Sequence, residues 1–181
     1  MELYEKTISE KLIFDGRIMR VHVDEVELPN GKTAKRELVD HNGGASVAAL
    51  TDEGNLIFVN QFRNPFQAVL TELPAGKLEK GEDPKKAAIR ELEEECGVRA
   101  DKIIELGAIY PTVAYCSEII YLYLATGLTK VRQHLDEDEF LSVEEISLEK
   151  ATQMVMNGEI SDSKTVALVL KVARLKDEGK I

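Results

Sequence analysis

The sequence predicts an α+β fold, in which helices flank a mixed sheet and a small antiparallel β region precedes it. Segments of alternating apolar residues, which are typical of half-buried strands, occupy residues 11–39. A helix with a clear start, stop and apolar face is predicted over residues 84–96, and two more are predicted near the end of the chain. Further strand-like segments lie between these helices, so strands and helices are expected to share one core.

The amino-terminal region is expected to contain three strands, over residues 11–21, 22–28 and 33–39. Pro-Asn-Gly-Lys at residues 29–32 predicts a hairpin turn before the third strand, because Asn-Gly readily adopts the positive φ that tight hairpin turns require. Residues 1–42 are therefore expected to form a β region of their own, and residues 43–181 the main domain.

The main domain is expected to begin with two strands, over residues 45–50 and 55–62. The first is an uninterrupted apolar run, which is typical of a buried strand. Thr-Asp-Glu-Gly at residues 51–54 predicts the turn between the two strands.

The helix over residues 84–96 has both of its ends marked. Asp83 can cap it, and Pro84 suits the first helical position, where a missing N–H breaks no hydrogen bond. Gly97 is a typical stop. Ala88 and Leu92 recur at helical spacing and give the helix an apolar face.

The rest of the chain continues the same pattern. Strands are expected over residues 103–110 and 119–125. One late helix is predicted over residues 147–158, and a last one begins at Ser161 or Asp162 and runs to about residue 176, with apolar residues inside it.

Composition limits the function classes. A chain of 181 residues with 44% apolar content is long enough for one folded domain with a real core. Its formal net charge of −10 argues against a nucleic-acid-binding surface. No apolar run of membrane-spanning length and no signal peptide is found. Cys96 and Cys116 lack metal-ligand spacing and are expected to be reduced, so a cytoplasmic protein with no membrane partner is inferred.

The central helix carries glutamates at residues 91, 93, 94 and 95. At about 100° per residue, Glu91 and Glu95 share one side of the helix, and Glu94 lies about 60° away. Carboxylates this close repel one another unless solvent or a cation compensates. A solvated surface helix is one interpretation, and a site for one or two hard divalent cations is the other.

The residues around these glutamates favour the metal site. Gly76 is followed by five residues and Glu82, and then by seven residues and the sequence Arg-Glu-Leu-Glu-Glu-Glu-Cys-Gly-Val at residues 90–98. This pattern resembles the Nudix box, the signature of the Nudix hydrolases, which use Mg²⁺ or Mn²⁺ to cleave nucleoside diphosphates linked to another moiety. The resemblance implies an α/β/α sandwich over residues 43–181.

The resemblance also implies roles for the matching positions. The metal ligands would be Glu91, Glu94, Glu95 and the backbone carbonyl of Ala75. Arg90 would orient the carboxylates, so that Arg90 and Glu94 count among the catalytic residues. The residues that shape the loop and helix would be Gly76, Glu82 and Gly97.

Segments outside the box resemble the ADP-ribose pyrophosphatase branch, at residues 25–32, 61–65, 72–77 and 135–140. Arg63 would suit a substrate diphosphate, because guanidinium grips phosphate oxygens in a bidentate manner. Glu72 would also face the substrate. The alternatives are a surface arginine and a solvated glutamate at the end of a strand.

The acidic run at residues 136–139 would hold the general base of the reaction. In similar enzymes a glutamate of this loop positions or deprotonates the attacking water, and Glu139 matches that position best. Glu137 is the second choice, a mechanism without such a base is a third, and a merely solvated acidic loop is the fourth.

One segment departs from the branch pattern. Val113 and Ala114 stand where Ser-Pro-Gly-Phe would place its proline and glycine, whereas Tyr115 and Glu118 still fit, Glu118 as a substrate-binding residue. Proline and glycine set the allowed dihedral angles of a loop, so this loop is free to differ in backbone.

The resemblance implies a homodimer that pairs through its amino-terminal strands, with Glu37 or His41 bordering the partner's site. Ordinary polar residues on a strand surface are the alternative. The first hypothesis for function is Mg²⁺-dependent hydrolysis of ADP-ribose to AMP and ribose 5-phosphate. The alternatives are a Nudix hydrolase for another sugar nucleotide, a dinucleotide or a modified nucleotide, and a sensor that binds ADP-ribose without cutting it.

Overall fold

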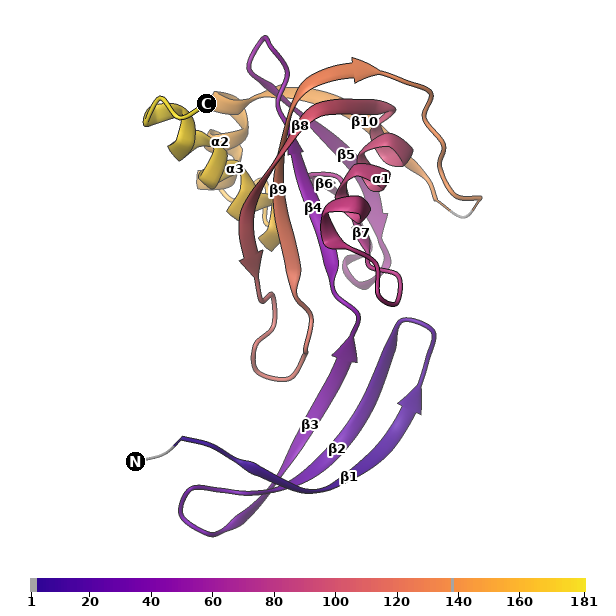
Figure 1. Ribbon diagram of the computed structural model, residues 1–181, viewed down its shortest axis with the longest axis vertical. Helices are drawn as coiled ribbons and strands as arrows, with labels where there is room; N and C mark the ends of the chain where they lie inside the picture. The colour runs from indigo at the N-terminus through magenta and orange to yellow at the C-terminus, as the bar shows by residue number, and fades with distance from the viewer. Residues whose placement is uncertain (1–2, 138) are drawn as a thin grey trace. The chain divides into compact units, whose positions relative to one another are not determined.

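The computed structural model describes residues 3–137 and 139–181 (Figure 1). The chain divides into two compact units. The first comprises the described residues up to Gly43 together with Tyr110–Ile119, and the second comprises Gly44–Ile109 and Ile120–Ile181.

The first unit is built on an antiparallel sheet with the strand order β1-β2-β3. Its strands are β1 (Lys6–Asp15), β2 (Met19–Glu27) and β3 (Thr33–His41). The predicted hairpin turn is confirmed, since the Leu28 amide donates to Lys32 O over 2.8 Å and Gly31 has a φ of 78°. This turn sets the register in which Glu27 lies opposite Thr33.

The predicted boundary between the first two strands was wrong. The chain does not run extended over residues 11–21 but turns after Asp15, where the Gly16 amide donates to Met19 O over 3.0 Å. Asp15-Gly16 is itself a turn signal, which the apolar residues on either side of it conceal. The first strand therefore begins earlier, at Lys6.

The second unit contains two sheets. The four-stranded sheet has the order β7-β4-β9-β8 and is mixed, because β4 runs parallel to β9. Its strands are β4 (Gly44–Ala49), β7 (Ala75–Lys77), β8 (Val98–Ile109) and β9 (Ile120–Lys130). The antiparallel three-stranded sheet, in the order β10-β5-β6, consists of β5 (Asn55–Arg63), β6 (Ala68–Glu72) and β10 (Leu141–Ser147), and a short 3₁₀ turn, η1 (Asn64–Phe66), follows β5.

The helices of this unit are α1 (Pro84–Cys96), α2 (Leu148–Met156) and α3 (Ser163–Asp177). Both predicted ends of α1 are confirmed: the Asp83 side chain accepts from the Lys86 amide, and Gly97 takes the left-handed conformation with a φ of 61°. Ser147 and Asp162 cap the two later helices in the same way. In the described part of the chain, no helix is both long and apolar enough to cross a membrane.

Side chains alternate along the buried strands and divide the core in two. On β4, Ala45, Val47 and Ala49 pack in the cluster that contains Leu92 of α1, whereas Ala48 packs in the cluster that contains Leu168 of α3. Within this unit α1 therefore lies on one side of the sheets and α2 and α3 lie on the other (Figure 1). This arrangement confirms the α/β/α sandwich.

Candidate active site

The loop between β7 and α1 brings Gly76 against Glu91. A Cβ atom on residue 76 would lie 1.6 Å from Glu91 Oε1, so a side chain at this position would displace the Glu91 carboxylate. Glycine at this position leaves room for the Glu91 carboxylate beside the strand, where any side chain would have to move it.

Glu82 ties this loop to the helix. Its carboxylate accepts a hydrogen bond from the Glu79 amide over 2.9 Å and another from Arg90 Nε over 3.1 Å. The hydrogen bond from Arg90 holds the pKa of the Glu82 carboxyl below its usual range. An ionised Glu82 thus holds Arg90 of the helix against the loop that precedes it.

Arg90 gathers two further carboxylates. Its Nη1 donates to Glu91 Oε1 and to Glu94 Oε2, each over 2.8 Å. Its bond to Glu82 and the charge of Glu91 raise the pKa of the guanidinium, although partial burial opposes this effect. Arg90 therefore stays charged and lies where it can orient both glutamates.

Glu95 projects from the buried side of α1 and is only 2% exposed. Its Oε2 accepts a hydrogen bond from the Ala75 amide over 3.0 Å, which connects the helix to β7. Burial raises the pKa of the Glu95 carboxyl to about 8, and the charges of Glu91 and Glu139 act in the same direction.

The loop residue Glu139 shares the electrostatic environment of the box. Its charge raises the pKa of both Glu91 and Glu95, and in each case burial is the larger cause. It is half-buried, whereas Glu137 is exposed. The burial of this residue and its influence on two box carboxylates agree better with Glu139 than with Glu137 as the candidate base. Asp138 of the same acidic run lies outside the described residues.

The donor set suits a hard divalent cation. Four carboxylates, those of Glu91, Glu94, Glu95 and Glu139, share one region, and carboxylate oxygen is the ligand that Mg²⁺ prefers. Burial, and to a smaller extent neighbouring negative charge, raises the pKa of Glu91 and Glu95, and a bound cation would favour their ionised forms. In this structure Glu91 and Glu94 bond to Arg90, and Glu95 bonds to the Ala75 amide. Some of these carboxylates would have to rotate for their oxygens to bind one ion.

Arg63 and Glu72 form a pair that the sequence did not predict. Arg63 Nε donates to Glu72 Oε1 over 2.6 Å, and Nη2 donates to Oε2 over 2.8 Å. Lys164, at the start of α3, also bonds to Glu72 Oε2. Sequence reasoning missed this lysine, although a basic residue in the first turn of a helix opposes the helix dipole and indicates an acidic partner.

The remaining site residues lie in the first unit. Glu37 is exposed on β3. Glu118 Oε1 lies 3.5 Å from His41 Nδ1, and the Ser117 hydroxyl accepts from the His41 amide over 3.0 Å. The loop that carries Glu118 is held beside β3, since the Val39 amide donates to Tyr115 O over 2.7 Å.

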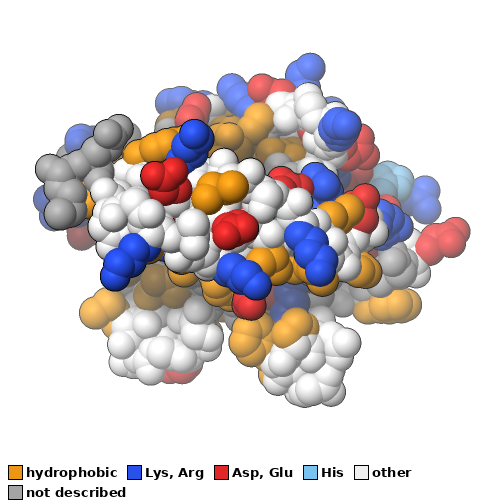
Figure 2. Space-filling view, turned by 90° about the horizontal axis from the view of Figure 1, so that it is seen from below, with side chains coloured by type: hydrophobic (Ala, Val, Ile, Leu, Met, Phe, Trp, Pro, Cys, Tyr) orange, Lys and Arg blue, Asp and Glu red, His pale blue; other side chains and the backbone are white. Residues whose placement is uncertain are grey.

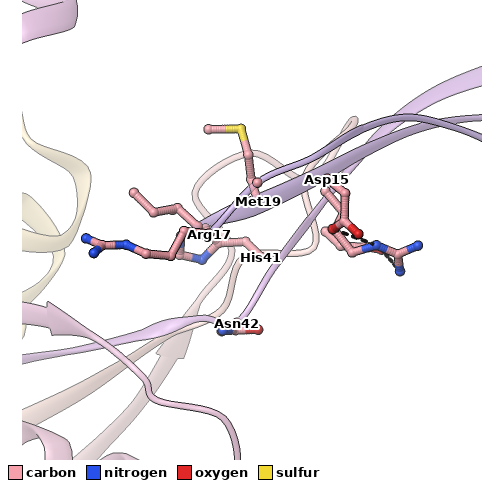
Figure 3. Close-up of a pocket in the computed structure, with 9 residues that line it drawn as sticks. Asp15, Arg17, Met19, His41 and Asn42 are labelled. Carbon is pink, nitrogen blue, oxygen red and sulfur yellow. Dashed lines mark ion pairs between the residues drawn. The ribbon is translucent and has the colours of Figure 1, made fainter.

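The first unit also holds a separate polar cluster. Glu10, His22 and Asp24 each offer a ligand atom within 4.8 Å of the others, and in the part of the chain that the structure describes they are the only such group of three His, Cys, Asp or Glu residues. His22 Nδ1 and Asp24 Oδ1 lie 2.7 Å apart and form a buried hydrogen bond. A pocket of about 170 Å³ in the same unit is lined by residues 15–20 and 40–42 (Figure 3). Neither feature contains a residue of the box.

Comparison with known proteins agrees with the box. The model of the NUDIX domain matches residues 40–169, and the model of the nucleoside diphosphate sugar hydrolase N-terminal domain matches residues 5–39. An ADP-ribose pyrophosphatase of Bacillus subtilis (strain 168) is 46% identical over 177 residues, which is 97% of this chain and 95% of the relative. A methanol dehydrogenase activator of Bacillus methanolicus is 47% identical over 167 residues, with 91% and 90% covered.

A crystal structure of an ADP compounds hydrolase shares the fold. Its TM-score is 0.88, with 20% sequence identity and 100% of both chains covered. Because the NUDIX model spans more than half of the sequence and two relatives exceed 45% identity over nearly its whole length, the chain belongs to the Nudix hydrolase family.

Proposed function

We propose that this Nudix hydrolase splits ADP-ribose into AMP and ribose 5-phosphate. The observation that supports the proposal is the network of Arg90, in which one guanidinium nitrogen bonds to both Glu91 and Glu94 on the helix that also carries the buried Glu95, the three glutamates proposed as cation ligands. The 46% identity with an ADP-ribose pyrophosphatase over 97% of the chain supports the choice of substrate.

The cofactor of this proposal is Mg²⁺, with Mn²⁺ as a substitute. Glu91, Glu94 and Glu95 would hold it together with the Ala75 carbonyl. When bound, the cation would screen the substrate's negative charge, polarise the phosphorus centre and lower the pKa of a water molecule. Arg90 orients Glu91 and Glu94 for this task, since one guanidinium nitrogen already bonds to both.

The chain's own residues supply the remaining steps. Arg63 binds diphosphate oxygens through N–H groups that Glu72 does not use. Glu139 accepts a proton as a water oxygen bonds to phosphorus, and the bond from that phosphorus to the bridging oxygen breaks. AMP and ribose 5-phosphate then leave, each with its own phosphate.

The choice of substrate has an alternative within the same chemistry. Val113 and Ala114 occupy an exposed loop in place of the branch's proline and glycine, and this favours testing other sugar nucleotides and dinucleotides. A non-catalytic sensor has less support, because such proteins commonly lose box carboxylates and this chain keeps Glu91, Glu94 and Glu95.

The amino-terminal strands are proposed to form a homodimer, with residues 1–42 as the dimerisation region and residues 43–181 as the hydrolase domain. β1 is an edge strand and is exposed along its length, including the apolar Ile8, Leu12 and Phe14. Figure 2 shows apolar side chains interspersed with charged ones on the face that it presents. An exposed edge of this kind favours pairing with a second chain, in which Glu37 would border the partner's site.

A cytoplasmic location is also proposed. Cys96 and Cys116 are both free, which suits a reducing compartment.

A second candidate function follows from the methanol dehydrogenase activator, which is 47% identical. The chain would then raise the rate at which a methanol dehydrogenase oxidises its substrate, through hydrolysis at the same box. Methanol oxidation should rise when the wild-type chain and Mg²⁺ are added and should not rise with Glu95→Gln.

Product analysis by chromatography tests the first proposal. The full chain is incubated with Mg²⁺ and ADP-ribose, with parallel incubations of other sugar nucleotides and dinucleotides. Release of AMP and ribose 5-phosphate, abolished by EDTA, is the expected result. Cleavage of a different nucleotide in the panel would make that nucleotide the proposed substrate in place of ADP-ribose. Binding of ADP-ribose without any cleavage would favour the non-catalytic sensor.

A further inference from the structure

Lys164 is a buried lysine beside the candidate active site. Its side chain is 11% exposed, although it lies in the first turn of α3, where a positive charge is unfavourable. Nζ bonds to Glu72 Oε2 and lies 2.9 Å from Asp162 Oδ2. A buried ammonium group is costly unless it is paired, so these two carboxylates account for its position.

Glu72 is a single carboxylate shared by two cations. Its side chain is 3% exposed, and it accepts Arg63 in a bidentate manner as well as Lys164. Burial opposes ionisation, but the hydrogen bond from Arg63 and the charge of Lys164 outweigh it and hold the pKa of Glu72 below its usual value. Glu72 is therefore an ionised carboxylate that is held in place by Arg63 and by Lys164.

The first turn of α3 holds the neighbouring backbone too. The Thr165 hydroxyl accepts from the Leu73 amide over 2.9 Å, and that hydroxyl in turn donates to Asp162 over 2.6 Å. Leu73 directly follows Glu72, so one helix terminus fixes both the side chain and the main chain just before the box.

Arg63 is the member of this network that is partly exposed to solvent. Its side chain is 37% exposed, and its bonds to Glu72 use two of the five guanidinium N–H groups. The charge of Glu95 contributes to its raised pKa, after the larger effect of the Glu72 hydrogen bond, which places Arg63 near the box. The unused N–H groups are those available to an anion.

We propose that Lys164 is a positioning residue, which holds Glu72 so that Arg63 presents its remaining N–H groups to the substrate diphosphate. The proposal rests on the proposed hydrolase function. Two cations balance the two carboxylates Glu72 and Asp162. Without Lys164 the buried Glu72 and the half-buried Asp162 would carry an uncompensated charge, and Arg63 would be drawn inward as the remaining counter-charge. Lys164 is expected to act through Glu72 and Arg63, since its Nζ bonds to Glu72 and Asp162.

A double-mutant cycle on the full chain tests this coupling. With ADP-ribose and Mg²⁺, Lys164→Met and Arg63→Ala are each expected to raise KM about tenfold or more and to change kcat by less than about threefold. The double variant should match Arg63→Ala alone, since Lys164 acts only through that arginine. Lys164→Arg keeps the charge and should recover part of the lost affinity.

A matched control is available on the same helix. Lys171 is exposed and donates to Leu106 O over 3.0 Å, so Lys171→Met should leave both kinetic constants unchanged. Additive losses in the double variant, or an unchanged KM in Lys164→Met, would overturn the proposal. If Lys164→Met does not fold, as judged by circular dichroism, Lys164→Gln enters the same cycle with the same expectations.

Assays of cleavage and of binding with the wild-type protein distinguish failure of this proposal from failure of the proposed hydrolase function. If it does not cleave ADP-ribose, the proposed function fails, and the cycle is measured as the dissociation constant of ADP-ribose by calorimetry. Non-additive losses of affinity would then still support the role of Lys164. If the wild type binds no ADP-ribose either, both proposals are overturned.

Discussion

The carboxylate of Glu91 lies so close to the backbone of Gly76 that a methyl group on residue 76 would meet Oε1 at 1.6 Å. The two residues belong to different elements, β7 and α1, and they are joined by the loop that Glu82 and Arg90 brace. The close approach places a charged side chain directly on the main chain of the neighbouring strand.

Gly76→Ala should therefore damage the site more than the fold. The new methyl group must displace the Glu91 carboxylate, which is the flexible end of that side chain, so the position of Glu91 changes more than the backbone does. We expect the specific activity to fall at least about tenfold in a protein that still unfolds cooperatively. Activity assays and thermal melts check this. Wild-type turnover in the variant would show that the position of Glu91 is unimportant.

Glu95→Gln should abolish turnover without harming stability. An amide can still accept from the Ala75 amide, and it removes a carboxylate whose burial raises its pKa. We expect kcat to fall about 10²-fold or more and Tm to stay the same or rise. Retained activity with a normal dependence on Mg²⁺ would remove Glu95 from the set of ligands.

Glu94→Gln is expected to behave like Glu95→Gln in activity. Glu94 shares Arg90 with Glu91, so its loss should leave Arg90 bonded to Glu91 and Glu82. Titration of turnover with Mg²⁺ should show a weakened response to the metal. An unchanged Mg²⁺ curve would contradict a role for Glu94 in holding the cation.

Glu139→Gln and Glu137→Gln form a matched pair in one loop. Glu139 is half-buried and influences the box carboxylates, whereas Glu137 is exposed. Loss of a general base costs about 10²–10⁴-fold, so kcat should fall by that amount in the first variant and remain unchanged in the second. The reverse ranking, measured under saturating substrate, would transfer the role to Glu137.

The first unit should lose stability as the pH rises through the raised pKa of His22. The hydrogen bond to Asp24 raises the pKa of His22, with help from the charge of Asp40 and against the effect of burial. A carboxylate oxygen of Glu10 lies 4.0 Å from Nδ1 of His22, and Asp40 Oδ1 lies 3.5 Å from its buried Nε2. Both ring nitrogens of His22 are therefore near carboxylates.

The direction of the stability change with pH follows from the raised pKa of His22. The stabilisation is fully present below the unfolded value of about 6.5 and is lost as pH rises through the folded value. Thermal melts across this window should show a fall in Tm for the wild type, and a smaller fall for His22→Gln. Parallel curves for the two proteins would rule out this role for His22.

Val113→Pro should change the choice of substrate but not the fold. Val113 is 80% exposed and follows Thr112, whose carbonyl accepts from the Tyr115 and Cys116 amides in a turn. Proline suits the second position of such a turn. The ranking of sugar nucleotides by kcat/KM should shift while Tm changes little. An unchanged ranking would show that this loop does not select the substrate.

Local signals in the sequence predicted much of this fold. The ends of α1 depend on Asp83, Pro84 and Gly97, which act through neighbouring residues, and the hairpin before β3 depends on Asn30-Gly31. Strands β6, β7 and β10 were not predicted. β7 has three residues and β6 has five, and four adjacent residues of β10 are exposed, so none of them shows a clear alternation.

The box pattern predicted which residues of the candidate site would stand together on α1, because helical spacing determines that. It could not predict the network around Glu72, because Arg63 lies on the neighbouring strand β5 and Lys164 is 92 residues away in the sequence. Contacts of that kind depend on tertiary packing, which no local pattern encodes.

The distance between Glu72 and Lys164 along the chain has a consequence for biosynthesis. The ribosome releases the strand that carries Glu72, and then the whole box helix, well before α3. Until α3 emerges and docks, the nascent chain has a carboxylate destined for the interior but lacks the lysine that neutralises it. The site thus reaches its final charge balance only after α3 has been synthesised and has docked, because Lys164 belongs to that helix.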